Sequence, residues 1–255
     1  MRRMAVPREL IEGATEEAEL ELPGEVSHYV LHVLRMSTGD QVELFDGTGL
    51  IVRGTLLRTG PPLLRVDETL KTEAGESPLF AVLFQAIPKG KRWDTVLEKA
   101  TELGVRAIVP LETKRTIVQV EKKKAASKVE RWEKMVAAAA RQSMRSLTPE
   151  IFAPLPIEEA LLKYSDLVHF VAHTKGEGRR SLLGSVKEHW SEEKKGIGIW
   201  IGPEGGFTEQ EVHKLEKAGA LFFHLGPRIL RADTAGLSAL TAIQLLCGDL
   251  GDEPL

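Results

Sequence analysis

The sequence predicts a two-part protein of 255 residues, in which a small β domain precedes a larger α/β domain built on a parallel sheet. Two observations predict this fold class. Short strand-like segments separated by turns that contain Gly and Pro dominate the first 72 residues, and buried strand-like runs alternate with helical patterns from Leu79 onward. The polar segment Lys71–Pro78 is typical of a linker, so we expect domains at residues 1–72 and 78–250.

The first domain is expected to hold one helix-like segment and several short strands. Apolar residues recur with helical spacing over Val26–Met36. Turn-forming residues at Asp46–Gly49 and Thr59–Pro62 separate the strand candidates, which are Val42–Phe45, Leu50–Leu57 and Leu63–Val66. Strands this short in a segment of this length fit a small β-barrel.

The second domain is expected to alternate strands and helices, which implies a parallel sheet. The strand candidates are apolar runs, namely Leu79–Ile87, Ala107–Val109, Leu167–Ala172, Ile197–Ile201 and Leu221–Leu225. The helices are marked by apolar stripes, capping boxes or terminating glycines. They are a helix over Trp93–Ala100 ended by Gly104, one from Ser127–Glu130 through Ala140, one from Thr208–Glu211 to Gly219, and the apolar helix Thr234–Leu246.

The composition favours a globular protein in a reducing compartment. The chain is 42% hydrophobic and 28% charged, and it has no run of apolar residues long enough to span a membrane. The first residues lack the apolar region of a signal peptide, so we expect a cytoplasmic location. Cys247 is the only cysteine, which excludes an internal disulfide, and its apolar helical context predicts a core position. No cluster of Cys and His has metal-ligand spacing, so no metal is expected.

Charge is distributed unevenly along the chain. The net charge is −3, but residues 86–148 hold 15 Lys and Arg against 7 Asp and Glu, a balance of +8 that leaves −11 for the rest. Such asymmetry indicates contact with a polyanion such as RNA, although a solvated helical face gives the same pattern. Residues 1–72 hold 8 Lys and Arg against 12 Asp and Glu, so RNA contact there requires a local patch.

Two loops that contain glycine follow neighbouring strand candidates. Gly202–Gly206 precedes a capped helix, and Leu225–Ala235 leads into the last helix. Ligands of α/β sheets bind beyond the carboxyl ends of the strands, and glycine lets a ligand approach the backbone. A Gly-Gly turn is also found as a plain tight connection. Neither loop has the dinucleotide or P-loop fingerprint, so a Rossmann dehydrogenase or a nucleotide hydrolase is unsupported.

The second loop also carries two arginines three residues apart. One of Arg228 and Arg231 is a candidate to hold the loop through a carboxylate such as Glu204, while the other faces a substrate. Both arginines being structural is the open alternative. Asp233 or Thr234 is expected to cap the last helix.

Several further segments, taken together, are similar to one known family. The C-terminal matches are Glu102–Val105, Arg131-Trp132, Arg141–Ser143 with Arg145, Gly202–Gly206, Arg228–Arg231 and Asp233–Ala235, and the N-terminal ones are Arg3, Val6-Pro7, His28, Val33–Arg35, Gly39-Asp40 and Phe45–Gly47. In this order along nearly the whole chain, they resemble the 16S rRNA (uracil-N3)-methyltransferases, the RsmE family of the SPOUT superfamily.

This resemblance implies both a fold and an activity. The implied fold is a PUA-like β-barrel that binds RNA, followed by an α/β SPOUT domain with a deep trefoil knot, in a homodimer. The implied activity is S-adenosylmethionine-dependent methylation of N3 of a specific uridine, uridine 1498, of 16S rRNA in the small ribosomal subunit. The final helix Thr234–Leu246 is the expected dimer seam.

The resemblance and the loops together give three sets of site residues. Arg231 is the first candidate, and Arg228 the second, for a cation that stabilises the uracil imide anion, with His173 as a possible proton relay. The expected cofactor-binding residues lie after three strands and are Ala172, His173, Thr174, Ile201, Gly202, Glu204, Gly205, Gly206, Leu225, Gly226, Ile229 and Leu230. The expected RNA contacts are cationic and are Arg2, Arg3, Arg35, Lys89, Lys91, Arg92, Arg141 and Arg145.

The sequence departs from the family at two places and leaves other functions open. Met4-Ala5 stands where two aromatic residues are usual, and Ala232-Asp233 stands where Thr-Glu is usual, which weakens a catalytic role for that carboxylate. The alternatives are a SPOUT enzyme that methylates a ribose 2′-hydroxyl or a tRNA base, a non-catalytic RNA-binding assembly factor, and a flavodoxin-like enzyme of small molecules.

Overall fold

The computed structural model describes residues 2–118, 120–173, 180–191 and 193–251, and the chain forms two compact units. Unit 1 consists of Met1–Glu76 and Ala140–Thr148, and unit 2 consists of Ser77–Ala139 and Pro149–Leu255. The segment Ala140–Thr148, which the sequence led us to expect in the second domain, therefore belongs to unit 1.

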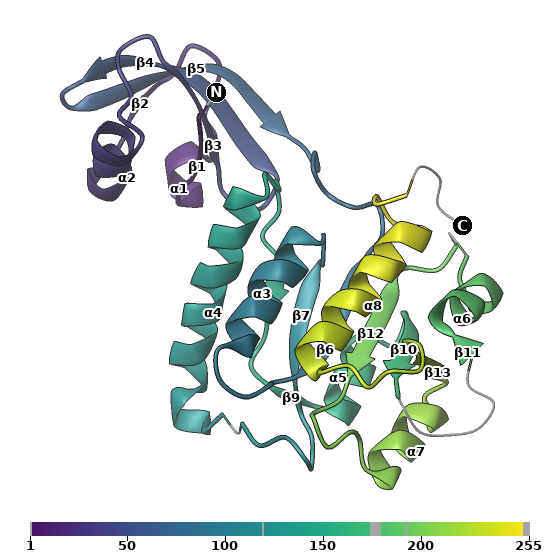
Figure 1. The fold of residues 1–255 in the computed structure, drawn as a ribbon. Coiled ribbons are helices and arrows are strands. Elements are labelled where there is room, and N and C mark those ends of the chain that lie inside the picture. Colours follow the sequence, from purple (N-terminus) through teal and green to yellow (C-terminus); the bar gives the residue numbers. More distant parts are fainter. Residues whose placement is uncertain (1, 119, 174–179, 192, 252–255) are drawn as a thin grey trace. The chain divides into compact units, whose positions relative to one another are not determined.

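Unit 1 is built on a five-stranded sheet in the order β1-β3-β4-β5-β2 (Figure 1). Strand β1 pairs with β3 in parallel, and the other pairs are antiparallel. Apolar side chains of β3, β4 and β5 fill the core, among them Leu44, Val52 and Leu64. The elements are β1 (Arg2–Ala5), α1 (Arg8–Ile11), β2 (Glu19–Glu21), α2 (Gly24–His28), the π-helical turn η1 (Tyr29–Val33), β3 (Gln41–Phe45), β4 (Leu50–Thr59) and β5 (Pro62–Lys71).

The three predicted strands of unit 1 are confirmed, and all three are longer than expected. The predicted helix over Val26–Met36 is instead the short helix α2 followed by η1. Arg35 then has a φ of 52°, in the left-handed region, so the helical turn ends before Met36. Strands β1 and β2 were not predicted, because three or four residues give too little periodicity to read.

Unit 2 contains a parallel sheet in the order β11-β13-β10-β12-β6-β7-β8, with β9 also paired to β7. Every pair in this sheet is parallel, as the alternation of strands and helices predicted. The strands are β6 (Ala81–Ala86), β7 (Ala107–Glu112), β8 (Glu150–Ile151), β9 (Leu155–Pro156), β10 (Val168–Ala172), β11 (Arg180–Ser181), β12 (Ile197–Ile201) and β13 (Leu221–His224).

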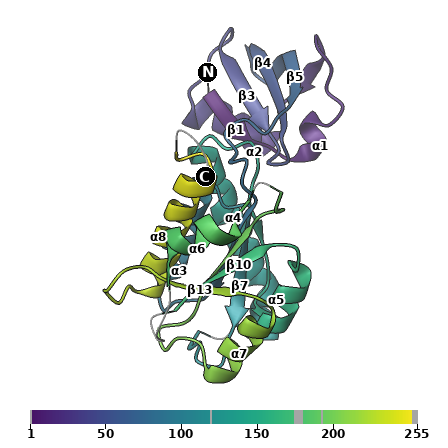
Figure 2. The same cartoon turned by 90° about the vertical axis from the view of Figure 1, so that its right-hand side faces the viewer.

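Helices cover both faces of this sheet (Figures 1 and 2). Successive residues of a strand point to opposite faces, so Leu83 and Ile199 pack on one side while Phe84 and Trp200 stack on the other. The first face is covered by α3 (Arg92–Glu102), α4 (Lys122–Gln142), α6 (Leu182–His189) and α8 (Ala232–Cys247), and the second by α5 (Ile157–Lys163) and α7 (Glu209–Lys217).

Two predicted helix starts are wrong. Helix α4 begins at Lys122, so Ser127 lies inside it and its hydroxyl donates to the carbonyl of Lys124 at 3.1 Å. The Lys and Ala residues before Ser127 are strong helix formers and extend the helix upstream. Helix α8 begins at Ala232, with Arg231 as the N-cap residue, so Asp233 lies in its first turn instead of capping it.

Two other helix signals are confirmed. Thr208 and Glu211 form the predicted capping box at the start of α7. Gly104, with a φ of 79°, follows the C-cap residue Leu103 of α3, at the position where a left-handed residue terminates a helix. Cys247 is buried at the end of α8, and burial raises the pKa of its thiol to about 11, which fits the predicted core role.

Candidate active site

The carboxyl ends of five neighbouring strands of unit 2 lie in one row. The parallel register aligns Phe223, Ala172, Ile201, Gln85 and Pro110 across β13, β10, β12, β6 and β7. The connections that follow these strands therefore leave the sheet at the same edge, which is where α/β sheets bind ligands. Both predicted glycine loops start at this edge.

The loop after β12 is held by its own turn and by the helix that follows. The Gly206 amide donates to the Pro203 carbonyl at 2.7 Å, and Gly206 has a φ of 68°. The buried Glu211 carboxylate accepts from the Thr208 amide at 2.7 Å and also from the backbone amide of Lys114 at 2.8 Å. A single carboxylate thus fixes the loop after β12 to the loop after β7.

Two arginines from other parts of unit 2 also contact the loop after β12. Arg92, at the start of α3, forms an ion pair with Glu204 at 3.4 Å. Arg115, after β7, donates from Nη1 to the carbonyl of Gly205 at 2.8 Å and to that of Phe207 at 3.4 Å. Glu204 therefore pairs with Arg92, and the suggestion that it pairs with Arg228 or Arg231 does not hold in this structure.

The glycines of the two loops differ in what they leave open. A side chain at Gly202 would meet the ring of Phe207 at 3.2 Å, and one at Gly205 would meet the side chain of Arg115 at 3.2 Å. An added Cβ at Gly206 or Gly226 would meet no atom within 4 Å. Close approach of a ligand to the backbone is therefore possible at Gly206 and Gly226, whereas the space over Gly205 is taken by the side chain of Arg115.

The loop after β13 presents both predicted arginines to solvent. Gly226 has a φ of 86°, and its amide donates to Nδ1 of His224 at 3.1 Å. Arg228 and Arg231 are exposed, and neither forms an ion pair within the part of the chain that the structure describes. Ile229, a predicted cofactor contact, is 87% exposed, so its side chain contributes an apolar surface to a binding site only when a ligand covers it.

The strand between these loops, β10, ends at Ala172. The amide of His173 donates to the carbonyl of Phe223 at 3.0 Å, and its ring lies edge-on to that of Phe222. His173 therefore sits at the predicted edge, next to the end of β13. The predicted cofactor contact Thr174 lies outside the described residues.

Sequence reasoning missed Gln85 and Arg115. Gln85 is fully buried near the end of β6, and its Nε2 donates to the carbonyl of Ala232 in the first turn of α8 at 3.4 Å. A side chain at Gly236 of α8 would lie 2.4 Å from Oε1 of Gln85. These contacts join residues about 90 to 150 positions apart, and no local pattern in the sequence signals them.

Two predicted RNA contacts are buried in unit 1. The side chain of Arg145 is 3% exposed and that of Glu76 is 1% exposed, and Nη2 of Arg145 lies 2.6 Å from Oε2 of Glu76. Nε of Arg3 lies 2.9 Å from Oε1 of Glu43, and its guanidinium stacks on the ring of Phe45. A phosphate has no access to either guanidinium, so the prediction is wrong for Arg3 and Arg145. Burial is a tertiary property that charge counts do not reveal.

The other predicted RNA contacts remain at the surface to different degrees. Arg141 is partly buried, and Arg92 is engaged with Glu204. The remaining four are exposed, two of them in unit 1 and two in the loop after β6; they are Arg2, Arg35, Lys89 and Lys91.

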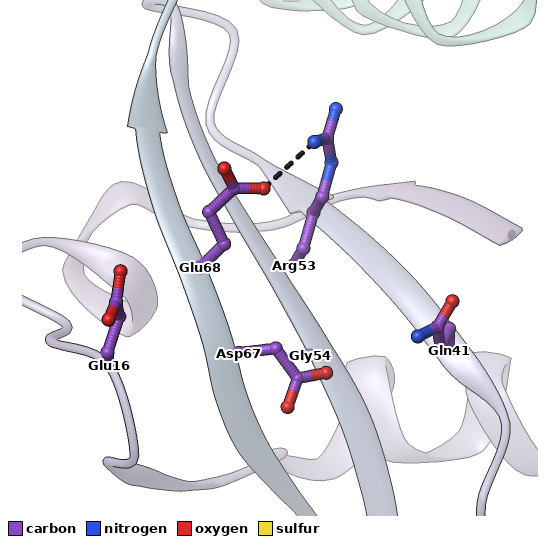
Figure 3. Close-up of a pocket in the computed structure, with 6 residues that line it drawn as sticks. All are labelled: Glu16, Gln41, Arg53, Gly54, Asp67 and Glu68. Carbon is purple, nitrogen blue, oxygen red and sulfur yellow. Dashed lines mark hydrogen bonds and ion pairs between the residues drawn. The ribbon is translucent and has the colours of Figure 1, made fainter.

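Two cavities lie away from the glycine loops. One, of about 380 Å³, lies on the sheet of unit 1 and is lined by acidic groups and by Arg53, which pairs with Glu68 (Figure 3). Its carboxylates, at Glu16, Asp67 and Glu68, disfavour a polyanion. The other, of about 450 Å³, includes Val168 and Leu221 and so lies at the amino ends of β10 and β13, opposite the candidate site.

One histidine at that opposite edge has a strongly lowered pKa. Burial lowers the pKa of His169 to about 4, and the indole Nε1 of Trp200 donates to Nδ1 of His169 at 2.9 Å. His169 is therefore a neutral core residue. Among the described residues, no group of His, Cys, Asp and Glu is arranged to hold a metal, and no helix is long and apolar enough to cross a membrane.

Comparison with known proteins gives the same family for both units. Residues 75–244 match the RNA methyltransferase domain family, and residues 22–68 match the RNA methyltransferase PUA domain family. The chain is 33% identical to the ribosomal RNA small subunit methyltransferase E of Bacillus subtilis, over 94% of this chain and 97% of that protein. It is 31% identical to the enzyme of the same name from Buchnera aphidicola, over 89% and 88% of the two chains.

A solved structure extends the likeness to three dimensions. The ribosomal RNA small subunit methyltransferase E of Neisseria gonorrhoeae, bound to S-adenosylmethionine, superposes with a TM-score of 0.81 at 33% identity. The superposition covers 98% of this chain and 99% of that one.

Proposed function

The chain belongs to the ribosomal RNA small subunit methyltransferase E family, and from this premise we propose that it methylates N3 of one uridine of 16S rRNA, uridine 1498, with S-adenosylmethionine as donor. One observation carries the proposal for this chain. The loops after β12 and β13 share the carboxyl edge of the sheet, where Gly206 and Gly226 leave the backbone open beside the exposed Arg228 and Arg231.

The residues of this edge suit an adenosyl group. Backbone groups at Gly206 and Gly226 are open to close approach, and the partly buried Leu225 and Leu230 provide apolar surface. Ile229 is a large apolar side chain left in solvent, and an adenine ring is a partner that would cover it. When bound, S-adenosylmethionine supplies an electrophilic methyl group on a sulfonium leaving group.

The protein's task is then to position the base and to stabilise the charge that develops on it. The bond from N3 to the methyl carbon forms as the bond from sulfur to that carbon breaks, and the N3 proton leaves. The guanidinium of Arg231 is proposed to donate to uracil O2 or O4 and so to stabilise the imide anion, with Arg228 as the second candidate. His173 is the candidate to relay the proton.

We also propose that the active form is a homodimer joined through α8. The helix has no charged residue from Thr234 to Cys247, and Leu245 is 53% exposed on it. An uncharged helix face with an exposed leucine is typical of a surface that a second copy covers. Leu245→Glu should shift the mass measured by light scattering from two chains to one, whereas a wild-type protein that is monomeric would refute the dimer.

The finer features of the family's fold and setting belong to the same proposal. These are closure of the sheet of unit 1 into a PUA-like barrel, a deep trefoil knot in unit 2 and action in the cytoplasm. Support for the PUA-like part comes from the family match over residues 22–68.

Nucleoside mass analysis tests the reaction. Small-subunit rRNA treated with the protein and S-adenosylmethionine should yield 3-methyluridine, on naked 16S rRNA or on assembled subunits. A 2′-O-methyl nucleoside without 3-methyluridine would refute the proposed position. Failure to bind the donor at millimolar concentration would favour a non-catalytic assembly factor.

A substitution tests the role of the arginine. Arg231→Ala should lower kcat by about 100-fold or more while the dissociation constants of donor and RNA change little, because the interaction strengthens only as charge develops. Arg228→Ala, which removes the second candidate on the same loop, is measured in parallel, and the variant with the larger fall in kcat identifies the cation. Full activity of the Arg231 variant would remove this residue from the mechanism.

A further inference from the structure

The side chain of Arg115 links two parts of the candidate site that are distant in sequence. Arg115 lies in the loop after β7, and this loop is fixed in place by the bond between the Lys114 amide and the Glu211 carboxylate. Within the loop, the hydroxyls of Thr113 and Thr116 are 2.7 Å apart. The base of the Arg115 side chain is therefore held on an ordered turn beside the loop after β12.

The guanidinium of Arg115 is bonded to the backbone on both sides of Gly206. Its Nη1 donates to the carbonyls of Gly205 and Phe207, and its methylene stem crosses Gly205 so closely that a Cβ there would lie 3.2 Å from Cδ. Gly206 is, with Gly226, one of the two glycines in the loops after β12 and β13 that have open space above them, and its φ is 68°. Arg115 therefore orients the carbonyls of the two residues on either side of the open glycine.

Only one nitrogen of this guanidinium is used. Nε and Nη2 of Arg115 have no hydrogen-bond partner within the described ranges, and the side chain is exposed. An arginine fork presents several donors in one plane, which suits a second, bidentate contact with a phosphate oxygen pair. The free side of Arg115 is thus available to an anion while Nη1 keeps its contacts with the loop.

Other cations lie at the same edge of the sheet. Lys114 is exposed next to Arg115, and Lys89 and Lys91 are exposed in the loop after β6, the strand next to β7. Arg92 contacts the loop after β12, the loop that Arg115 also binds, through its ion pair with Glu204. These five cations outnumber the carboxylates of Glu112, Glu204 and Glu211 at this edge, which therefore attracts a polyanion.

We propose that Arg115 binds a backbone phosphate of the substrate RNA and couples this contact to the conformation of the donor-binding loop at Gly205–Phe207. The inference rests on the proposed function of that loop. An RNA phosphate on Nε and Nη2 holds the guanidinium in place, which in turn holds the two carbonyls that flank Gly206. Linkage then requires that RNA tighten donor binding and that the donor tighten RNA binding by the same factor.

The test is a thermodynamic cycle on the full-length protein. The dissociation constant of S-adenosylmethionine is measured by calorimetry with and without saturating 16S rRNA, for the wild type, Arg115→Gln, Arg115→Lys and Lys217→Gln. Lys217 is the matched control, because it loses the same charge at the end of α7, where the chain returns to the opposite edge of the sheet. The wild type and Lys217→Gln should bind the donor at least about 5-fold more tightly with RNA.

The two Arg115 variants should distinguish the contribution of the positive charge to RNA affinity from the effect of RNA on donor affinity. Arg115→Gln should abolish the effect of RNA on the donor and lower the slope of log affinity for RNA against log salt by about 0.7–0.9, the loss of one phosphate contact. Arg115→Lys should keep the slope and still lose the coupling, because one ammonium cannot serve the loop and a phosphate with a fixed fork.

The outcomes distinguish this inference from the proposed function. Coupling that persists in Arg115→Gln, or a wild type without coupling, overturns the role of Arg115 even if 3-methyluridine is formed. A wild type that binds no donor and forms no methylated nucleoside overturns the proposed function itself.

Discussion

Arg145 was predicted to contact RNA, but in the structure it forms a buried ion pair with Glu76, and the stability of the protein tests this structural role. The Glu76 carboxylate accepts from Nε and Nη2 of Arg145, and Oε1 also accepts from the amide of Leu147 at 2.8 Å. Removing one partner leaves the other charge buried and uncompensated, which costs about 3–5 kcal/mol. At a urea slope of about 2 kcal/mol per M, a loss of about 4 kcal/mol lowers the unfolding midpoint by about 2 M.

The perturbation is Arg145→Met, and its control is Arg8→Met. Arg8 pairs with Glu12 at 2.8 Å with both side chains more than half exposed, so its removal should cost no more than about 1 kcal/mol. The double variant Arg145→Met/Glu76→Gln should recover most of the loss, because it removes the stranded charge and keeps an acceptor for the Leu147 amide.

Urea unfolding followed by circular dichroism measures the loss, and filter binding at several salt concentrations measures RNA affinity. We expect a large fall in the midpoint with an unchanged salt dependence. The opposite result, normal stability with a shallower salt dependence, would show that Arg145 serves a phosphate and that the assignment from burial is mistaken.

Three further predictions concern unit 2. The pKa of His169 is about 4 in the folded protein against about 6.5 in the unfolded chain, so below pH 6.5 the unfolded state binds a proton that the folded state does not. The free energy of unfolding should therefore fall by about 3 kcal/mol more between pH 6.5 and 4 in the wild type than in His169→Gln. Identical pH profiles of unfolding for the two proteins would refute this. Gly236→Ala should lower the free energy of unfolding by about 1–3 kcal/mol, because its Cβ would lie 2.4 Å from Oε1 of the buried Gln85, and an unaltered urea midpoint would show that Gln85 moves aside. Thr208→Ala should cost about 1 kcal/mol through loss of the capping box on α7, measured by urea unfolding, and a cost near zero would mean that Glu211 alone holds the helix start.

The sequence alone determined the features of this protein that depend on residues close together in the chain, namely the buried strands and one helix cap. Runs such as Ile197–Ile201 are long enough to be recognised as buried strands, and their alternation with helices requires a parallel sheet. The Thr208–Glu211 signal was read correctly because a capping box involves only residues within one helical turn. The same kind of signal at Ser127 failed, since the helix-forming residues before it extended the helix.

The order of motifs along the chain also gave the family, which the comparisons bear out. The placement of the glycine loops at one edge followed from the parallel sheet, because all carboxyl ends of parallel strands lie on the same side.

Only the tertiary structure decided what individual charged and polar side chains do. A count of arginines treats Arg3, Arg115 and Arg145 alike. In the structure, Arg3 and Arg145 form ion pairs with shielded side chains, whereas Arg115 lies across Gly205 and keeps Nε and Nη2 available as donors. Their roles depend on contacts between segments tens of residues apart, and such contacts exist only after the chain has packed. Burial and long-range pairing are set by the whole fold, so no local pattern in the sequence encodes them.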